Sequence, residues 1–261
     1  SLLALVTAMA VLVALPFTAA GSRLLVVALD NATELEVEYR AGTLFGQLSL
    51  ANVVVPTDSA IVSLVDVRTE LATNCLWRAA ICLNQLTVAS LDVVLPSQTE
   101  EAVDPDEATP FWPLPFEVSS EKLVIDQLRV HWDSGELRGR ALKAAAVVAG
   151  ERVQIEDATA SDIWLRVPGS EHEPMNAGSE MPDVDMPLEL VVGSLILLDS
   201  GWIIGDLRNA YKELVLRGQW QGTKLSLSDL TVSNPEWGGA QLQGAMDFRH
   251  PYKVDVAGQF S

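Results

Sequence analysis

One short pattern recurs along this chain and constrains its fold more than any other feature. It reads apolar, any, apolar, any, small polar, apolar, as in "LSLANV" from Leu48. Alternating strands also produce such matches by chance, but the near-constant interval between copies is typical of repeat architectures, whose periods run from about 20 to 50 residues. The further copies are "LTVASL" from Leu86, "LVIDQL" from Leu123, "VQIEDA" from Val153, "LVVGSL" from Leu190 and "LSLSDL" from Leu225.

Alternation between apolar and polar residues predicts that the repeated units are strands. In "ELEVEYR", Leu35, Val37 and Tyr39 fall on one face and charged residues fall on the other. This period of two is typical of a half-buried strand. Turn sequences such as "RAGTLFG", "WDSGEL" and "LDSGW" separate the apolar runs. We therefore expect a mainly β fold, in which units of a few antiparallel strands stack into one long, curved, repeat-built sheet.

A long sheet with one apolar face needs something to cover that face. A second sheet, a set of helices or an apolar ligand would each serve. No long amphipathic helical segment stands out after residue 22. A closed sandwich would hide the face, whereas a curved, open groove would leave it accessible to lipid.

The N-terminal stretch is apolar and uncharged as far as Arg23. Residues 2–20, "LLALVTAMAVLVALPFTAA", would span roughly 28 Å as a helix at 1.5 Å per residue, which is about one bilayer core. The alternative is a cleaved signal peptide, whose apolar region is usually shorter, at about 7–15 residues. We favour a transmembrane anchor over residues 1–22. Under either interpretation the bulk of the chain leaves the cytoplasm.

The two cysteines, Cys75 and Cys82, lie close together in "NCLWRAAICLNQLTVASLDVVLP". A local disulfide, a metal or redox site, and two unrelated buried thiols are the three alternatives. The histidines, His131, His172 and His250, are scattered without ligand spacing, and the C-x-x-C redox spacing is absent. In an exported protein a nearby pair is usually a disulfide. We therefore predict a structural disulfide that closes a short turn before a strand.

Two acidic, proline-rich segments interrupt the alternation. They are "PSQTEEAVDPDEATPFWPLPF" from residue 96 and "PGSEHEPMNAGSEMPDVDMP" from residue 168. Proline removes a ladder donor, and this charge density does not build a core. We interpret both as exposed loops, either plain solvated linkers or segments that gate the sheet or bind calcium. The predicted organisation is an anchor (1–22), a first β segment with the cysteine turn (23–96), an acidic loop (97–116), a second β segment (117–167), an acidic loop (168–187) and a third β segment (188–261).

Charge and motif content narrow the functional classes. The chain has 35 acidic against 17 basic residues, a formal net charge of −18, which argues against nucleic acid as a partner. It lacks G-x-S-x-G, H-E-x-x-H, a P-loop and a G-x-G-x-x-G before a helix. Nothing in it nominates a catalytic residue, a metal ligand or a cofactor. We expect a protein that is not an enzyme.

The cysteine turn and its flanking segments resemble the N-terminal part of the TamB family, inner-membrane-anchored members of the AsmA-like group. The resemblance is carried by "CLWRAAICLNQLTVASLDVVLP", most specifically by its cysteine turn, and by the order of the parts around it. Those parts are an N-terminal anchor, "GQLSLANVVV", the cysteine turn and an acidic insert ending in "PLPFEVSSEKLVIDQLRVHW". "MPDVDMPLELVVGSLILLDSGW" and "LSDLTVSNPEWGGAQLQGAMDFRHPYKVDVAGQF" follow, so that the resemblance covers essentially the whole chain.

The resemblance implies a function that spacing and composition do not. Members of this family are similar to bridge-like lipid transfer proteins, whose long curved sheet forms an apolar groove across the periplasm. They are implicated in phospholipid transport from the inner to the outer membrane. They also work with TamA, an outer-membrane barrel, in outer-membrane protein assembly or secretion, through a C-terminal domain absent from this sequence. We therefore expect a single-pass inner-membrane protein of a Gram-negative cell, with its bulk in the periplasm.

Two functional hypotheses follow, and an exported β-sandwich binding module is a distant third. The first is a lipid conduit with an open apolar face. The second is a scaffold or chaperone-like component for outer-membrane proteins, with exposed strand edges and an otherwise closed face. In the conduit, Cys75 and Cys82 would brace the membrane-proximal end. The residues expected to face into the groove are Leu48, Leu50, Leu86, Val88, Leu123, Ile125, Leu190, Val192, Leu225 and Leu227.

Overall fold

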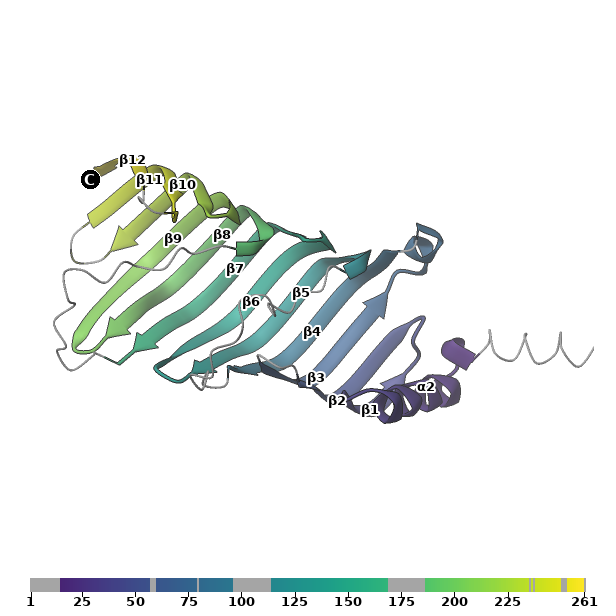
Figure 1. Ribbon diagram of the computed structural model, residues 1–261. Coiled ribbons are helices and arrows are strands. Elements are labelled where there is room, and N and C mark those ends of the chain that lie inside the picture. The colour runs from purple at the N-terminus through teal and green to yellow at the C-terminus, as the bar shows by residue number, and fades with distance from the viewer. Residues whose placement is uncertain are drawn as a thin grey trace, which may run out of the picture.

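The computed structural model is dominated by a single twisted, curved β-sheet (Figure 1). It describes residues 15–56, 60–78, 80–95, 114–168, 186–234, 236, 238–249 and 253–260. The expected mainly β class is confirmed. The strands are β1 (Glu36–Gly42), β2 (Gln47–Pro56), β3 (Ile61–Leu71), β4 (Ala80–Val94), β5 (Leu114–Trp132), β6 (Gly135–Gly150), β7 (Arg152–Val167), β8 (Met186–Ile204), β9 (Leu207–Gly222), β10 (Lys224–Asn234), β11 (Gly238–Asp247) and β12 (Lys253–Phe260).

The strands pair in the order in which they occur in the chain, from β1 to β12. Nine of the eleven neighbouring pairs are antiparallel, as expected. The pairs β4–β5 and β7–β8 are parallel, which corrects the expectation of a wholly antiparallel sheet. A parallel pair needs a long crossover connection, unlike an antiparallel hairpin. The two acidic, proline-rich segments connect the strands of these pairs, and their last residues belong to β5 and β8. Residues 96–113 and 169–185 are outside the described residues.

The N-terminal region differs from a continuous anchor helix. A short 3-10 helix, η1 (Leu15–Phe17), is followed by the helix α2 (Ala19–Ala32). Thr18 between them has an extended backbone, and its side chain accepts a hydrogen bond from the Gly21 N–H at 3.1 Å, which caps α2. The predicted boundary at residue 22 therefore falls inside a helix, and the predicted β segment starts with helical residues. Residues 1–14 lie outside the described part, within which no helix has the length and apolar character that a membrane crossing requires.

Helix α2 lies against the β1 edge of the sheet (Figure 1). The Val37 N–H donates to Asp30 Oδ1 at 2.9 Å, and the Leu44 N–H donates to Ser22 Oγ at 2.9 Å. Ser22 Oγ in turn donates to the carbonyl of Pro16 at 3.1 Å. These contacts use backbone groups at the sheet edge that would otherwise face water or another chain.

The core is a layer on one face of the sheet. Val67, Val88 and Ile125, from β3, β4 and β5, are the buried residues of its central cluster. The described strands form one sheet in a single layer, and helix α2 lies at its β1 edge. The closed alternatives, a second sheet or a layer of covering helices, are therefore absent from this part of the chain. The partly buried side chains packed on the cluster are Leu50, Val53, Leu64, Leu86, Leu91, Leu123, Leu128 and Leu142.

Candidate functional site: an open apolar face

The ten residues predicted to line a groove lie on one face of the sheet, which we call the apolar face. Residues paired across neighbouring strands project from the same side. Leu86 pairs with Leu123, and Val88 pairs with Ile125. In the register of β2 to β4, Thr69 of β3 stands between Leu48 and Leu86. All ten side chains are buried or half-buried.

The same row continues into the C-terminal half of the sheet. Leu123 pairs with Ala144 of β6, which pairs with Ala158 of β7. Ala158 pairs with Leu195 of β8, opposite Leu216 of β9. A second row runs beside it through Leu190, Trp220, Leu225, Met246 and Val254.

In the recurring sequence pattern, the third and sixth positions are three residues apart, an odd step. The structure explains how the apolar residues at both positions reach the same face. The apolar residues of the pattern stand at the first, third and sixth positions, and strict alternation would send the last to the opposite face. Local irregularities of the strands absorb the extra residue. In β5, Leu128 packs on the same cluster as Ile125, three residues earlier. In β8, the register against β9 shifts between Val192 and Leu195.

The irregularities align across the sheet. One line of paired residues runs from Asn52 through Val65, Ser90 and Gln127 to Arg140. Beside this line and its continuation into β7 and β8, four non-glycine residues have positive φ angles: Asp66, Ala141, Asp162 and Asp199. Three of the four are aspartates, one of the residue types that best tolerate this conformation. The step therefore occurs at matching positions in neighbouring strands, and the apolar rows stay continuous.

Sequence reasoning missed the apolar residues that follow this step. The available signal was the sixth position of the pattern, which is apolar in every copy. The returning strands β3, β6, β9 and β11 carry no copy of the pattern, so their contributions were missed as well. The additional members of the apolar face are Val53, Leu64, Val67, Leu91, Leu128, Leu142, Ala158, Leu195, Leu216, Leu230 and Leu242.

The opposite face, here called the polar face, carries the charges. Arg129 adjoins Leu128 of the apolar face, so its side chain projects the other way. It lies 3.8 Å from Asp92. Arg152 lies 3.7 Å from Glu189, and Arg217 lies 3.3 Å from Asp229. These pairs are partly exposed to solvent, so their contribution to stability is small, about 0–1 kcal/mol each.

A disulfide joins Cys75 and Cys82 across the turn between β3 and β4, as predicted. Cys75 lies in the short helix η2 (Thr73–Arg78) and Cys82 lies in β4, with their Cα atoms 5.8 Å apart. The Ala72 N–H donates to the Cys82 carbonyl at 2.8 Å, so the turn is also closed by the backbone. The disulfide fixes how β4 leaves this turn. That it braces a membrane-proximal end stays a prediction.

Within the described residues, two ionisable groups have shifted pKa values. Burial raises the pKa of the Tyr211 phenol, which pairs with Ser200 across β8 and β9. A hydrogen bond from the Thr223 hydroxyl, followed by one from the Arg249 N–H, lowers the pKa of Asp247. In the described part of the chain, His, Cys, Asp and Glu side chains form no group of three or more able to hold a metal ion. Neither titrating group lies in a constellation that suggests catalysis.

The model of the TamB N-terminal domain family matches residues 7–260. The chain belongs to this family. The searches of curated proteins and of solved structures found no match. Membership in the TamB family and the long, open sheet agree with a bridge-like protein.

Proposed function

We propose that this TamB-family chain carries phospholipids along its apolar face, from the inner membrane toward the outer membrane. One observation carries the proposal: the apolar face runs across all twelve described strands, and no described element covers it. At about 4.8 Å between strands, twelve strands extend for roughly 50 Å. This length supports a role in spanning part of an aqueous gap.

The energetics favour such a surface. Moving the roughly 30 methylenes of a diacyl lipid through water costs about 24 kcal/mol, at about 0.8 kcal/mol each. A continuous apolar surface lowers this barrier while the headgroup stays in water at the open side. Lipid movement along the face needs unbroken rows of apolar side chains, and it needs no catalytic residue or cofactor.

The N-terminal residues support a location of this end of the protein at the inner membrane, with the sheet in the periplasm. Residues 2–20 are uncharged. In α2, which follows, Leu24 and Val27 are exposed to solvent, as is Phe17 just before it. Apolar side chains exposed together at one end of a sheet suit contact with lipid. We propose that this end of the sheet receives lipid from the membrane.

Site-specific photo-crosslinking in cells tests the conduit. A photoreactive residue replaces Leu123, Leu190 or Leu227 on the apolar face, and the adducts are analysed for phospholipid. The matched controls are the neighbours Val124, Val191 and Ser226, which project from the polar face. We expect lipid on the first set alone. Folded protein without lipid at any apolar position would exclude lipid conduction by this region.

A scaffold for outer-membrane protein assembly, working with a TamA-type barrel, is the second candidate. In this alternative, client strands would pair with exposed strand edges of the protein. Photoreactive residues at Asp255 and Ala257 would then yield protein adducts, and those on the apolar face would yield no lipid.

A further inference from the structure

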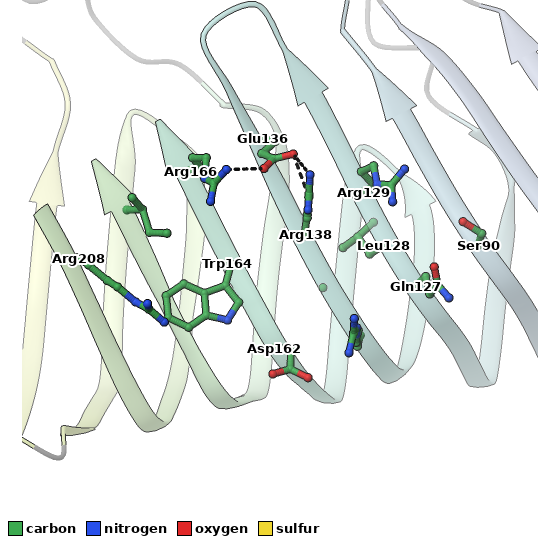
Figure 2. Close-up of a pocket in the computed structure, with 13 residues that line it drawn as sticks. Ser90, Gln127, Leu128, Arg129, Glu136, Arg138, Asp162, Trp164, Arg166 and Arg208 are labelled. Carbon is green, nitrogen blue, oxygen red and sulfur yellow. Dashed lines mark hydrogen bonds and ion pairs between the residues drawn. The ribbon is translucent and has the colours of Figure 1, made fainter. Parts of the chain in front are cut away.

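A hollow on the polar face lies over β4 to β9 and is rich in arginine. It encloses about 460 Å³. Figure 2 shows the side chains that line it, among them Trp164 and Glu136. Its arginines are Arg129, Arg138, Arg140, Arg166 and Arg208.

These arginines concentrate positive charge in a strongly acidic protein. Five guanidinium groups line the hollow against two carboxylates, in a chain whose net charge is −18. Glu136 is shared between Arg138, at 2.7 Å, and Arg166, at 3.8 Å (Figure 2). In the described part of the chain, neither Arg140 nor Arg208 forms an ion pair with a carboxylate. The hollow therefore has an excess of positive charge.

An indole ring is fixed against one side of the hollow. Trp164 pairs with Gly201 of β8, and a Cβ atom at Gly201 would lie 2.8 Å from Cζ3 of the ring. The glycine thus lets the indole approach the backbone of β8. The guanidinium carbon of Arg208 lies over the ring, 4.8 Å from its centroid. This stacking holds the Arg208 guanidinium beside the hollow without using its hydrogen-bond donors.

We propose that this hollow binds an organic phosphate ester. Guanidinium groups match the oxygens of phosphate in a two-pronged geometry, and several around one hollow suit an anion of more than one charge. A volume of about 460 Å³ exceeds what one inorganic ion fills and lies in the range of small-molecule sites. The indole offers a surface for the organic part of the ester. A phospholipid headgroup and a soluble phosphate ester share this chemistry.

This site is independent of lipid conduction, because it lies on the polar face, opposite the rows that would carry acyl chains. Loss of binding at the hollow would leave the crosslinks at Leu123 and Leu190 unchanged. Conversely, a chain that conducts no lipid would still bind the ester.

Isothermal titration calorimetry on the purified full chain tests the proposal. The probes are glycerol 3-phosphate, a free monoester, and glycerophosphoglycerol, the diester headgroup of phosphatidylglycerol without its acyl chains. The test variant is R140Q/R208Q, which removes two exposed guanidinium groups without breaking a described ion pair. The matched control is R217Q, which removes a guanidinium from the same face outside the hollow.

We expect at least one ester to bind. The R140Q/R208Q variant should bind it more weakly, with a Kd raised by about tenfold or more, because charge-assisted hydrogen bonds are lost. R217Q should bind like the unmodified chain, and added salt should weaken all binding. Tighter binding of the diester would identify a lipid headgroup as the source, and tighter binding of the monoester a soluble ester. No binding of either ester would overturn the proposal, as would equal affinity in both variants. An acidic peptide that competes at the same arginines and binds more tightly would assign the hollow to a protein partner instead.

Discussion

The central strands β4 and β5 and the terminal strand β12 contribute to the same apolar face with very different burial. Val88 is 1% exposed and Ile125 is 6% exposed. Val254, Val256 and Phe260 of β12 are 59%, 44% and 80% exposed. The residue types are similar, so their intrinsic hydrophobicity does not explain the contrast.

The difference arises from the neighbours. β4 and β5 have partners on both sides, and branched side chains from those partners surround Val88 and Ile125. β12 has a described partner on one side only, and the row through Val256 contains Gly244. A valine in an open sheet is therefore buried by the strands beside it. This dependence on neighbours is typical of proteins built from stacked repeats.

The sharpest test of this difference in burial introduces the same negative charge into β4 and into β12. Val88→Asp should lower the free energy of unfolding by roughly 4 kcal/mol, because an unpaired carboxylate would be buried. Val256→Asp should lower it by less than about 1 kcal/mol, since the carboxylate stays hydrated. Urea unfolding followed by circular dichroism measures both values. Equal losses would show that burial by neighbouring strands does not set local stability here.

The disulfide gives the next largest effect, and it acts on the central region. Replacing Cys75 and Cys82 by serine together should cost about 2.5 kcal/mol, from the loop-closure entropy of so short a ring. Thermal unfolding of the double variant, beside the unmodified chain with and without reductant, measures the loss. Amide hydrogen exchange should show weaker protection in β3 and β4 and unchanged protection in β11. An effect concentrated in β11 would contradict a local role for the disulfide.

A substitution at Ser200 tests how a buried side chain stabilises the strand irregularity at Asp199. Ser200 is fully buried; its hydroxyl donates to the Leu198 carbonyl at 2.8 Å and accepts the Ile163 N–H at 3.1 Å. Ser200→Ala should lower the free energy of unfolding by about 1–2 kcal/mol, because a buried N–H loses its partner. The exposed Ser226→Ala is the control, with an effect within about 0.5 kcal/mol. Similar losses in both variants would mean that the hydroxyl is dispensable.

The smallest effect concerns Asp247 at the C-terminal end of β11. Its pKa is lowered chiefly by the Thr223 hydroxyl, which donates at 2.8 Å. A lowered pKa in the folded state stabilises the fold above the ordinary carboxyl pKa, and this contribution is lost as the pH falls through the folded-state value. Thr223→Val should raise the pKa of Asp247, as measured by NMR titration of its carboxyl carbon. An unchanged pKa would assign the shift to the Arg249 N–H.

Several features could be predicted from the sequence because they depend on residues close together in the chain. Alternation in β1, with Val37 and Tyr39 half-buried between exposed neighbours, is visible in seven letters. The same signal placed Leu48, Leu123 and Leu225 on one face. The cysteine pair was predictable because the two residues lie in a single turn.

Other features depend on contacts between distant segments, and local patterns do not contain them. Helix α2 begins at Ala19 because Thr18 interrupts an apolar run and because β1 offers an edge to cover. The irregular steps are fixed by alignment across strands, since a step in one strand requires a matching step in the next. The hollow around Trp164 combines residues from β4 to β9, and these residues form no recognisable motif in the sequence.

The sequence by itself therefore determined the class of fold, the character of the two faces and the disulfide, because a period of two and a short ring are local properties of the chain. Only the tertiary structure decided which pairs run parallel, how deeply each apolar residue is buried and which arginines gather in one hollow. These depend on strand register, and register arises from hydrogen bonds and packing between segments far apart in the sequence.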